Sequence, residues 1–353
     1  MKSLSVITDP VYKKKPFNSF DKLFLPLLRD ERDLPFVYLT LKITFTLVPL
    51  AVLLFALSVG SAAWWLCAVA YFFLNNFYFK GPFGLMFHCT CHRLWFKKKY
   101  NALNYYLPWF IGLFFGQTPE TYFSHHIGMH HIENNLPDDK SSTMAYKRDE
   151  FTEWLRYFAN FFFIGLVELV QYFFGKNRKK LAYKSVTGEF FFFFLCIGLS
   201  IVNWQATLVV FILPFVISRI IMMLGNFAQH AFVDANDPGN DYKNSITCIN
   251  TNYNHKCWND GYHISHHEKP AMHWTEHPTY FLATLDKYIK NDAIVFDNIH
   301  FLHVFFYLMN KRYDLLAKNF VNLGDKFSSD AEIETFLRSR TQPILSYGNT
   351  AVA

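Results

Sequence analysis

Histidines gather in this sequence at spacings that can bind metal ions. Four of them stand in the stretch HHIGMHH, residues 125–131, and one triplet there has the pattern H-x-x-x-H-H: His126, His130 and His131. A second triplet in NDGYHISHH has the pattern H-x-x-H-H: His263, His266 and His267. Residues three or four apart on a helix share one face, so each triplet can aim its imidazoles at one point.

Two shorter patterns accompany the triplets. His88 and His92 form H-x-x-x-H in FHCTCHR, and Asn226 and His230 form N-x-x-x-H in GNFAQH. One spaced pair is a weak signal among 15 histidines in 353 residues, whereas two triplets in one chain exceed what chance provides. His125 is an alternative to His126 as a ligand.

The chemistry that this set favours is transition-metal binding. Neutral imidazole is the commonest protein ligand and suits Fe, Zn, Cu and Ni. Nine clustered histidines exceed the need of one four-coordinate Zn²⁺, and two metal ions would use them all. Few acidic residues stand among the boxes, which argues against Mg²⁺ or Ca²⁺.

The composition indicates a membrane protein with several spans. Apolar residues make up 52% of the chain, phenylalanine occurs 41 times, and charged residues fall to 18%, below the ~25% of soluble domains. The net charge of +6 is small for the length, and its cations flank apolar segments, so we expect no nucleic-acid partner. Six cysteines without a paired motif predict a reducing compartment, and the N-terminus does not resemble a signal peptide.

Four apolar segments are candidates for transmembrane helices. We place them at about 36–59, 61–79, 188–203 and 206–225, because ~20 residues at 1.5 Å each cross the ~30 Å of hydrocarbon. A turn near Asn203–Gln205 joins the last two. The fold class expected is therefore all-α and integral to the membrane, with four transmembrane helices in two hairpins and a cytoplasmic helical cap that carries the histidines.

Basic residues set the expected orientation. The tight turns inside both hairpins carry no Lys or Arg, whereas residues 13–15, 97–99 and 176–184 are basic. By the positive-inside rule, both termini and all histidine boxes are cytoplasmic. Two further apolar stretches, about 105–116 and 157–174, are expected to lie in the membrane interface, because the first is short and the second contains Glu168 and Gln171.

The boxes and the paired spans between them resemble the membrane fatty acid desaturase family, a superfamily that includes hydroxylases and ketolases. The resemblance covers roughly residues 36–290 and implies a di-iron centre that uses O₂ and two electrons on a lipid acyl chain. It implies nine metal ligands: His88, His92, His126, His130, His131, His230, His263, His266 and His267. It also implies a water-mediated metal contact for Asn226.

The sequence departs from the family pattern in its first box. Many relatives have an acidic residue after the first histidine, where this chain has Cys89. The task of orienting the ligands then passes to residues such as Asp234, Asp260 or Glu133. No His-Pro-Gly-Gly motif of a fused cytochrome b5 domain is present, so a separate donor, of ferredoxin or cytochrome b5 type, must supply the electrons.

The expected activity is insertion of a double bond into the acyl chain of a membrane lipid or acyl thioester. One alternative is a di-iron hydroxylase or ketolase of acyl chains or carotenoids, and another is a non-catalytic metal-binding membrane protein. A bacterial inner membrane is favoured over the endoplasmic reticulum. The expected organisation is an N-terminal cytoplasmic segment (1–35), a membrane domain (36–290) and a C-terminal cytoplasmic segment (291–353) with a loosely ordered tail of ~25 residues.

Overall fold

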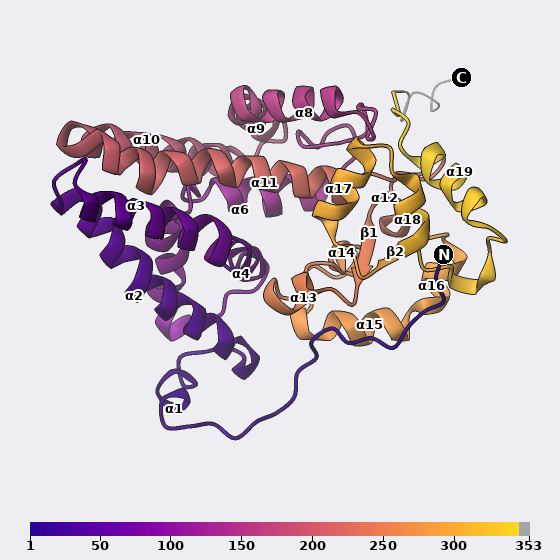
Figure 1. Cartoon of the computed structure of the whole chain (residues 1–353), viewed down its shortest axis with the longest axis horizontal. Coiled ribbons are helices and arrows are strands. Elements are labelled where there is room, and N and C mark those ends of the chain that lie inside the picture. The colour runs from indigo at the N-terminus through magenta and orange to yellow at the C-terminus, as the bar shows by residue number, and fades with distance from the viewer. Residues whose placement is uncertain (346–353) are drawn as a thin grey trace. The chain divides into compact units, whose positions relative to one another are not determined.

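The structure, a computed structural model, describes residues 1–345 and is mostly helical (Figure 1). Its elements up to the middle of the chain are α1 (Asp21–Phe24), η1 (Glu31–Asp33), α2 (Leu34–Ala56), α3 (Ala62–Phe73), η2 (Leu74–Phe79), α4 (Lys80–His92), η3 (Lys98–Tyr105), η4 (Leu107–Ile111), α5 (Gly112–Phe114), α6 (Thr121–His125), η5 (His126–His130), α7 (His131–Glu133), α8 (Phe151–Phe163) and α9 (Gly165–Gly175). The remaining elements are α10 (Lys179–Thr207), η6 (Leu208–Ile212), α11 (Leu213–Gln229), α12 (Asp241–Asn244), β1 (Ile246–Ile249), α13 (Asn252–Lys256), α14 (His263–Glu268), η7 (Trp274–Glu276), α15 (His277–Ala283), α16 (Leu285–Lys290), β2 (Ile294–Asp297), α17 (Phe301–Met309), α18 (Tyr313–Asn319), η8 (Leu323–Asp325) and α19 (Asp330–Arg340).

The chain divides into two compact units, each built from separate stretches of sequence. The first unit comprises Met1–Val11, Gly128–Tyr172 and Ile221–Ala353. The second unit comprises Tyr12–Ile127 and Phe173–Ile220. The long apolar helices belong mainly to the second unit, and both strands belong to the first.

In the second unit, α2 and α3 lie side by side (Figure 1). The indole Nε1 of Trp64 donates to the carbonyl of Leu54 at 3.0 Å, which fixes the two helices to each other near their joining turn. That turn ends at Ser61, whose hydroxyl accepts from the backbone N–H of Trp64 and caps α3. From α3 the chain continues helically through the π-helical η2 into α4.

The second apolar region is a long helical run with one break. Lys179–Gln229 covers 51 residues, more than twice the length needed to cross ~30 Å of hydrocarbon. Asn203 interrupts it with non-helical angles (φ −158°, ψ 97°), and its side chain accepts from the N–H of Ala206 at 3.0 Å. The break falls where the sequence predicts a turn, and α10 lies beside the start of α11, where Phe192 stacks on Phe215 (Figure 1).

Two helices in the described residues are long and apolar enough to cross a membrane, Glu31–Ala56 and Lys179–Gln229. The pair α8 and α9 qualifies as a third only if it is taken as one span, and its two helices are bent by 67° at the break. Helices thus cover all four predicted segments, but the arrangement of four spans and the interfacial position of 157–174 stay predictions.

The predicted helical fold is confirmed for most of the chain, but the first unit also contains a small sheet that an all-α fold would not have. Strands β1 and β2 pair in parallel there, with Ile246 opposite Ile294, and every residue of both strands is buried. Each strand is a four-residue run, ITCI and IVFD. Runs this short show no period that separates a buried strand from a helical turn.

The expectation of a loose C-terminal tail also needs correction. Helix α19 occupies Asp330–Arg340 and buries Ile333 and Leu337. Residues 346–353 of the predicted tail lie outside the described residues.

Candidate metal centre

Four of the predicted histidine ligands converge inside the first unit. His130 ends η5, His230 follows α11, and His263 and His267 stand one turn apart on α14. All four are buried, and one nitrogen from each lies within 4.8 Å of the others. The Nε2 atom of His263 lies 3.2 Å from that of His230 and 3.1 Å from that of His267.

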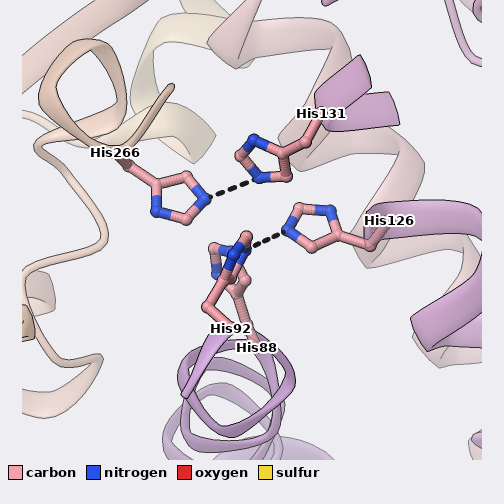
Figure 2. A group of neighbouring side chains, drawn as sticks. All are labelled: His88, His92, His126, His131 and His266. Carbon is pink, nitrogen blue, oxygen red and sulfur yellow. Dashed lines mark hydrogen bonds between the residues drawn. The ribbon is translucent and has the colours of Figure 1, made fainter. Parts of the chain in front are cut away.

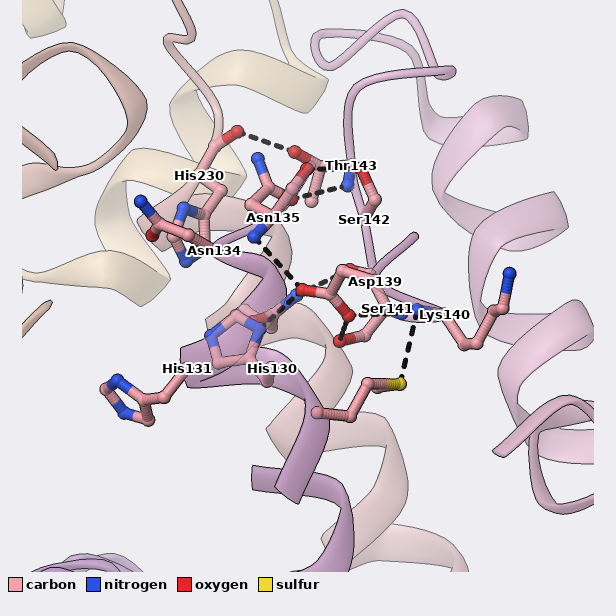
Figure 3. A network of polar contacts seen from close by, with 12 residues as sticks. His130, His131, Asn134, Asn135, Asp139, Lys140, Ser141, Ser142, Thr143 and His230 are labelled. Carbon is pink, nitrogen blue, oxygen red and sulfur yellow. Dashed lines mark hydrogen bonds and ion pairs between the residues drawn. The ribbon is translucent and has the colours of Figure 1, made fainter. Parts of the chain in front are cut away.

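The protein holds the opposite nitrogens of two of these rings. Nδ1 of His130 lies 2.7 Å from Oδ2 of Asp139, and Nδ1 of His230 lies 2.9 Å from the backbone carbonyl of Asn244 (Figure 3). An acceptor at Nδ1 fixes the tautomer and directs the lone pair of Nε2 toward the group, which is how metal-binding histidines are oriented in proteins.

Asp139 is itself fixed by the loop that follows the second histidine box. Its carboxylate accepts from the backbone N–H groups of Asn135 (3.1 Å) and Ser141 (2.8 Å) and from the Ser141 hydroxyl (2.7 Å) (Figure 3). The same loop reaches the end of α11, because the Thr143 hydroxyl donates to the carbonyl of His230 at 2.8 Å. The loop therefore connects two of the four histidines.

Burial keeps two of these imidazoles, His230 and His267, neutral. It lowers the pKa of His230 to about 3, with a further contribution from neighbouring His130. Burial and the adjacent rings also hold the pKa of His267 well below its ordinary value. A neutral ring keeps one nitrogen lone pair free for a metal ion at physiological pH.

A close approach to β1 positions the segment that leads into α14. The backbone N–H of Cys248 donates to the carbonyl of Gly261 at 2.7 Å, and Gly261 donates to Oδ1 of Asn254 at 2.9 Å. A Cβ at position 261 would lie 2.3 Å from the Cys248 carbonyl, so only glycine fits here. The strand that the sequence analysis missed thus holds the entrance to the third box.

The N-terminal residues secure the same segment from another side. The buried carboxylate of Asp9 accepts from the Tyr262 hydroxyl at 2.6 Å and from the backbone N–H groups of Asn250 (2.7 Å) and Thr251 (3.3 Å). The Asn259 amide donates to the carbonyl of Pro10 at 2.7 Å. Tyr262 directly precedes His263, so this contact joins the beginning of the chain to a candidate ligand.

The remaining candidate ligands form one set in each unit. In the first unit, Nε2 of His131 lies 2.9 Å from Nε2 of His266 (Figure 2). In the second unit, Nε2 of His92 lies 3.0 Å from Nε2 of His126, and the rings of His88 and His126 are 4.5 Å apart (Figure 2). Helix α4 supplies His88 and His92, and η5 begins at His126.

The spacing of the histidines suggested that each box directs its imidazoles at one point, but the structure divides the third box between two groups. His263 and His267 of the third box face His130 and His230, whereas His266 of the same turn faces His131. His263 and His267 are four residues apart and lie about 40° from each other around the helix, whereas the adjacent His266 and His267 lie about 100° apart. His125 belongs to neither histidine group.

Two further predictions concern the surroundings of the ligands. The amide nitrogen of Asn226 donates to the carbonyl of Ser141 (3.0 Å) and to the Tyr157 hydroxyl (2.6 Å), which fixes its orientation; its water-mediated contact with a metal stays a prediction. Asp139, nine residues after His130, is the orienting carboxylate that the sequence analysis missed.

The three acids named instead have other contacts. Asp234 forms an ion pair with Arg340 at 2.9 Å, Glu133 accepts from the Tyr172 hydroxyl at 2.5 Å, and Asp260 accepts from the Tyr253 hydroxyl at 2.6 Å. The sequence alone did not reveal Asp139, because it stands in the loop NNLPDDK and not at a helical spacing of three or four residues from a histidine of the box.

The comparisons with known proteins bear on this arrangement. The family described as Fatty acid desaturase matches residues 62–296, about two thirds of the chain and a range that contains all nine histidines. No curated protein and no solved structure gives a significant match. The chain therefore belongs to the fatty acid desaturase family.

Proposed function

We propose that the protein is an O₂-dependent di-iron desaturase that introduces a double bond into a fatty acyl chain. The observation that carries the proposal is the buried group of four histidines, His130, His230, His263 and His267, in a member of an oxidoreductase family. Nitrogen donors with their far sides held by Asp139 and Asn244 suit iron and do not suit Mg²⁺ or Ca²⁺.

We assign two iron ions to the nine histidines. The group of four in the first unit would hold one ion. The other five predicted ligands, His88, His92, His126, His131 and His266, are assigned to the second ion.

When bound, the iron pair would supply the oxidising chemistry: O₂, two electrons and two protons remove two hydrogens from adjacent carbons and leave two molecules of water. The chain's own residues fix the geometry. Asp139 and the Asn244 carbonyl hold two ligand rings in one tautomer, and the apolar helices of the second unit exclude water from the acyl chain.

The electrons would come from a separate protein of ferredoxin or cytochrome b5 type, and the substrate would be a membrane lipid or an acyl thioester.

We further propose four spans in two hairpins, α2 with α3 and α10 with α11, with the histidines and both termini in the cytoplasm. The break at Asn203 and the turn before Ser61 support two hairpins. A bacterial inner membrane is the compartment we favour.

The proposal is tested by expression in a host that lacks the activity, with lipid analysis by gas chromatography and mass spectrometry. We expect an oxygen-dependent unsaturated product, about two iron ions per chain, and loss of both in His267→Ala. His255→Ala, on an exposed position of α13, is the control and should retain both. A hydroxylated or ketolated product would instead indicate the related oxidation, and zinc without any oxygen-dependent product would overturn the proposal.

A further inference from the structure

Two segments that are far apart in the sequence lie side by side near the start of α2. Residues 20–30 precede that helix, residues 94–105 follow the first histidine box, and both segments belong to the second unit. Leu28 and Phe96 pair as an antiparallel bridge, and the backbone N–H of Lys97 donates to the carbonyl of the residue before Leu28 at 2.8 Å. The side chains of the two segments therefore form one continuous surface.

Both segments expose cations that have no acidic partner. The first segment contributes Lys22 and Arg29, the second contributes Lys97, Lys98 and Lys99, and all five are exposed. In the part of the chain that the structure describes, none of the five forms an ion pair. Their charges are thus available to a ligand outside the chain.

Acidic side chains do not cancel this charge. Residues 94–119 contain neither Asp nor Glu. In the first segment, the carboxylate of Asp30 forms ion pairs with Arg32 at 2.7 Å and with Arg93 at 3.0 Å, and Asp21 is buried. The surface therefore presents net positive charge and selects for an anionic partner.

Apolar side chains are exposed among these cations. Leu23 is 67% exposed directly beside Lys22, and Leu94 and Leu103 on the second segment are 44% and 40% exposed. A surface that combines exposed leucines with cations is typical of protein segments that lie in the headgroup layer of a membrane. We call the exposed residues of the two segments the amphipathic surface.

The amphipathic surface lies next to a helix that can cross a membrane. Residues 20–30 lead directly into Glu31–Ala56, which is long and apolar enough to do so. A headgroup layer of roughly 5–7 Å covers each side of the hydrocarbon core, and lysines extend their amines into this layer. Residues directly before such a helix therefore lie at the depth of the headgroups.

We propose that the amphipathic surface binds the headgroups of anionic phospholipids. The cations attract the phosphate groups, and the exposed leucines enter the layer just beneath them. An acidic soluble protein would also match the cations, but the bilayer around Glu31–Ala56 covers the leucines as well. The inference does not depend on the desaturase activity, because it concerns only the membrane contact of the second unit.

The test measures hydrogen–deuterium exchange of the full-length protein in lipid nanodiscs by mass spectrometry. Nanodiscs of phosphatidylcholine are compared with nanodiscs of equal parts phosphatidylcholine and phosphatidylglycerol. The test variant combines Lys22→Gln, Lys98→Gln and Lys99→Gln. It keeps Lys97, because the amine of this residue donates to the Pro26 carbonyl at 2.9 Å and helps to join the two segments.

We expect phosphatidylglycerol to slow exchange about tenfold in peptides from both segments of the wild type, and to have little effect on the test variant. Salt at about 1 M should remove the effect, because the Debye length falls to ~3 Å. No slowing in the wild type, or equal slowing in the test variant, would overturn the inference. The salt series keeps the test decisive if the variant does not fold, since slowing of the wild type that persists at high salt also counts against the inference.

Two further variants separate the surface from net charge and from simple ion binding. The combination of Lys256→Gln, Lys290→Gln and Lys318→Gln removes the same charge from exposed positions of the first unit and should behave as the wild type. Leu23→Gln should weaken the slowing by a smaller factor than the test variant does. Loss of the effect in the first-unit control, or an unchanged effect in Leu23→Gln, would contradict a lipid surface at these segments.

Poly-glutamate added to nanodiscs of phosphatidylcholine tests the other class of partner. If it slows exchange in both segments while phosphatidylglycerol does not, the surface serves an acidic protein and the inference is wrong. None of these measurements needs iron or turnover, so their outcome is independent of the proposed function.

Discussion

The two regions that carry histidines are held in place by different forces. In the first unit, directional hydrogen bonds fix the ligands: Asp139 at His130, the Asn244 carbonyl at His230, and Asp9 at Tyr262. In the second unit, α4 is fixed largely by ring packing such as that of Phe83 on Phe115. Hydrogen bonds depend strongly on the angle between donor and acceptor, whereas packing mainly requires that neighbouring side chains leave no gap.

This difference predicts different effects of mutations in the two units. The first unit fixes its donor atoms through their hydrogen-bond partners, and the second unit is held mainly by packing of apolar and aromatic side chains. Variants that cut a hydrogen bond in the first unit should therefore lower stability or metal affinity.

The largest effect is expected at Arg148, which is fully buried and donates only to backbone carbonyls in the contacts the structure describes: Ala231, Thr143, Met144, Tyr146, Arg340 and Gln342. Arg148→Met should lower the free energy of unfolding by at least about 3 kcal/mol, because it leaves several buried acceptors unsatisfied. Chemical unfolding in detergent measures this. Arg156→Met, at an exposed arginine paired with Glu153, should change it by less than about 0.5 kcal/mol.

The next effect concerns the N-terminal contact. Asp9→Ala should cost about 2 kcal/mol of unfolding free energy and lower the iron content, because Tyr262 and two backbone N–H groups lose their acceptor. Tyr262→Phe removes one of these bonds alone. A double-mutant cycle should show strong non-additivity; additive costs would mean that the carboxylate does not act through Tyr262.

A smaller change is expected from Asp139→Asn, which removes the charge opposite His130. Iron affinity should fall about tenfold, the lower end of what such orienting partners contribute, while the fold persists. Titration of metal-free protein with Fe²⁺ measures the affinity. Asp138→Asn, one residue earlier and exposed, should bind iron as the wild type does, and equal affinities for all three proteins would refute the role of Asp139.

The smallest effect is a pH dependence at the start of α17. Burial, with neighbouring His303, lowers the pKa of His300 to about 4, and its ring accepts from the N–H of Leu302 as a helix cap. The unfolded chain binds this proton near pH 6.5, so the stabilisation is complete above pH 6.5 and is lost as pH falls toward 4, by less than about 1 kcal/mol after solvent screening.

The substitution His300→Asn keeps a capping side chain but does not titrate. Metal-free His300→Asn should therefore lose less stability than metal-free wild type between pH 7 and 4.5. Identical slopes in chemical unfolding would show that His300 does not titrate in this range.

Much of the site could be predicted from the sequence because its ligands stand at helical spacings. His263 and His267 are four apart, and a helix carries them to the same side. The break at Asn203 was also foreseeable, since two apolar stretches met at a polar turn. Spacing along one element suffices in both cases.

The rest depends on contacts between distant residues. Asp9 meets Tyr262 across 253 positions, and Asp139 reaches His130 through a loop whose path is set by its own hydrogen bonds. Strands β1 and β2 are stabilised by each other, 48 residues apart by register, and neither has a pattern of its own. Such pairings leave no periodic trace in the sequence.

The short helix α14 has a consequence for how the protein can change. One turn of backbone sends His263 and His267 to one neighbourhood and His266 to another. Inserting or deleting a residue in this turn would rotate all three imidazoles together, so neither neighbourhood could be remodelled by a backbone change without disturbing the other. We therefore expect changes near this site to occur in the side chains around the turn and not in the length of the turn.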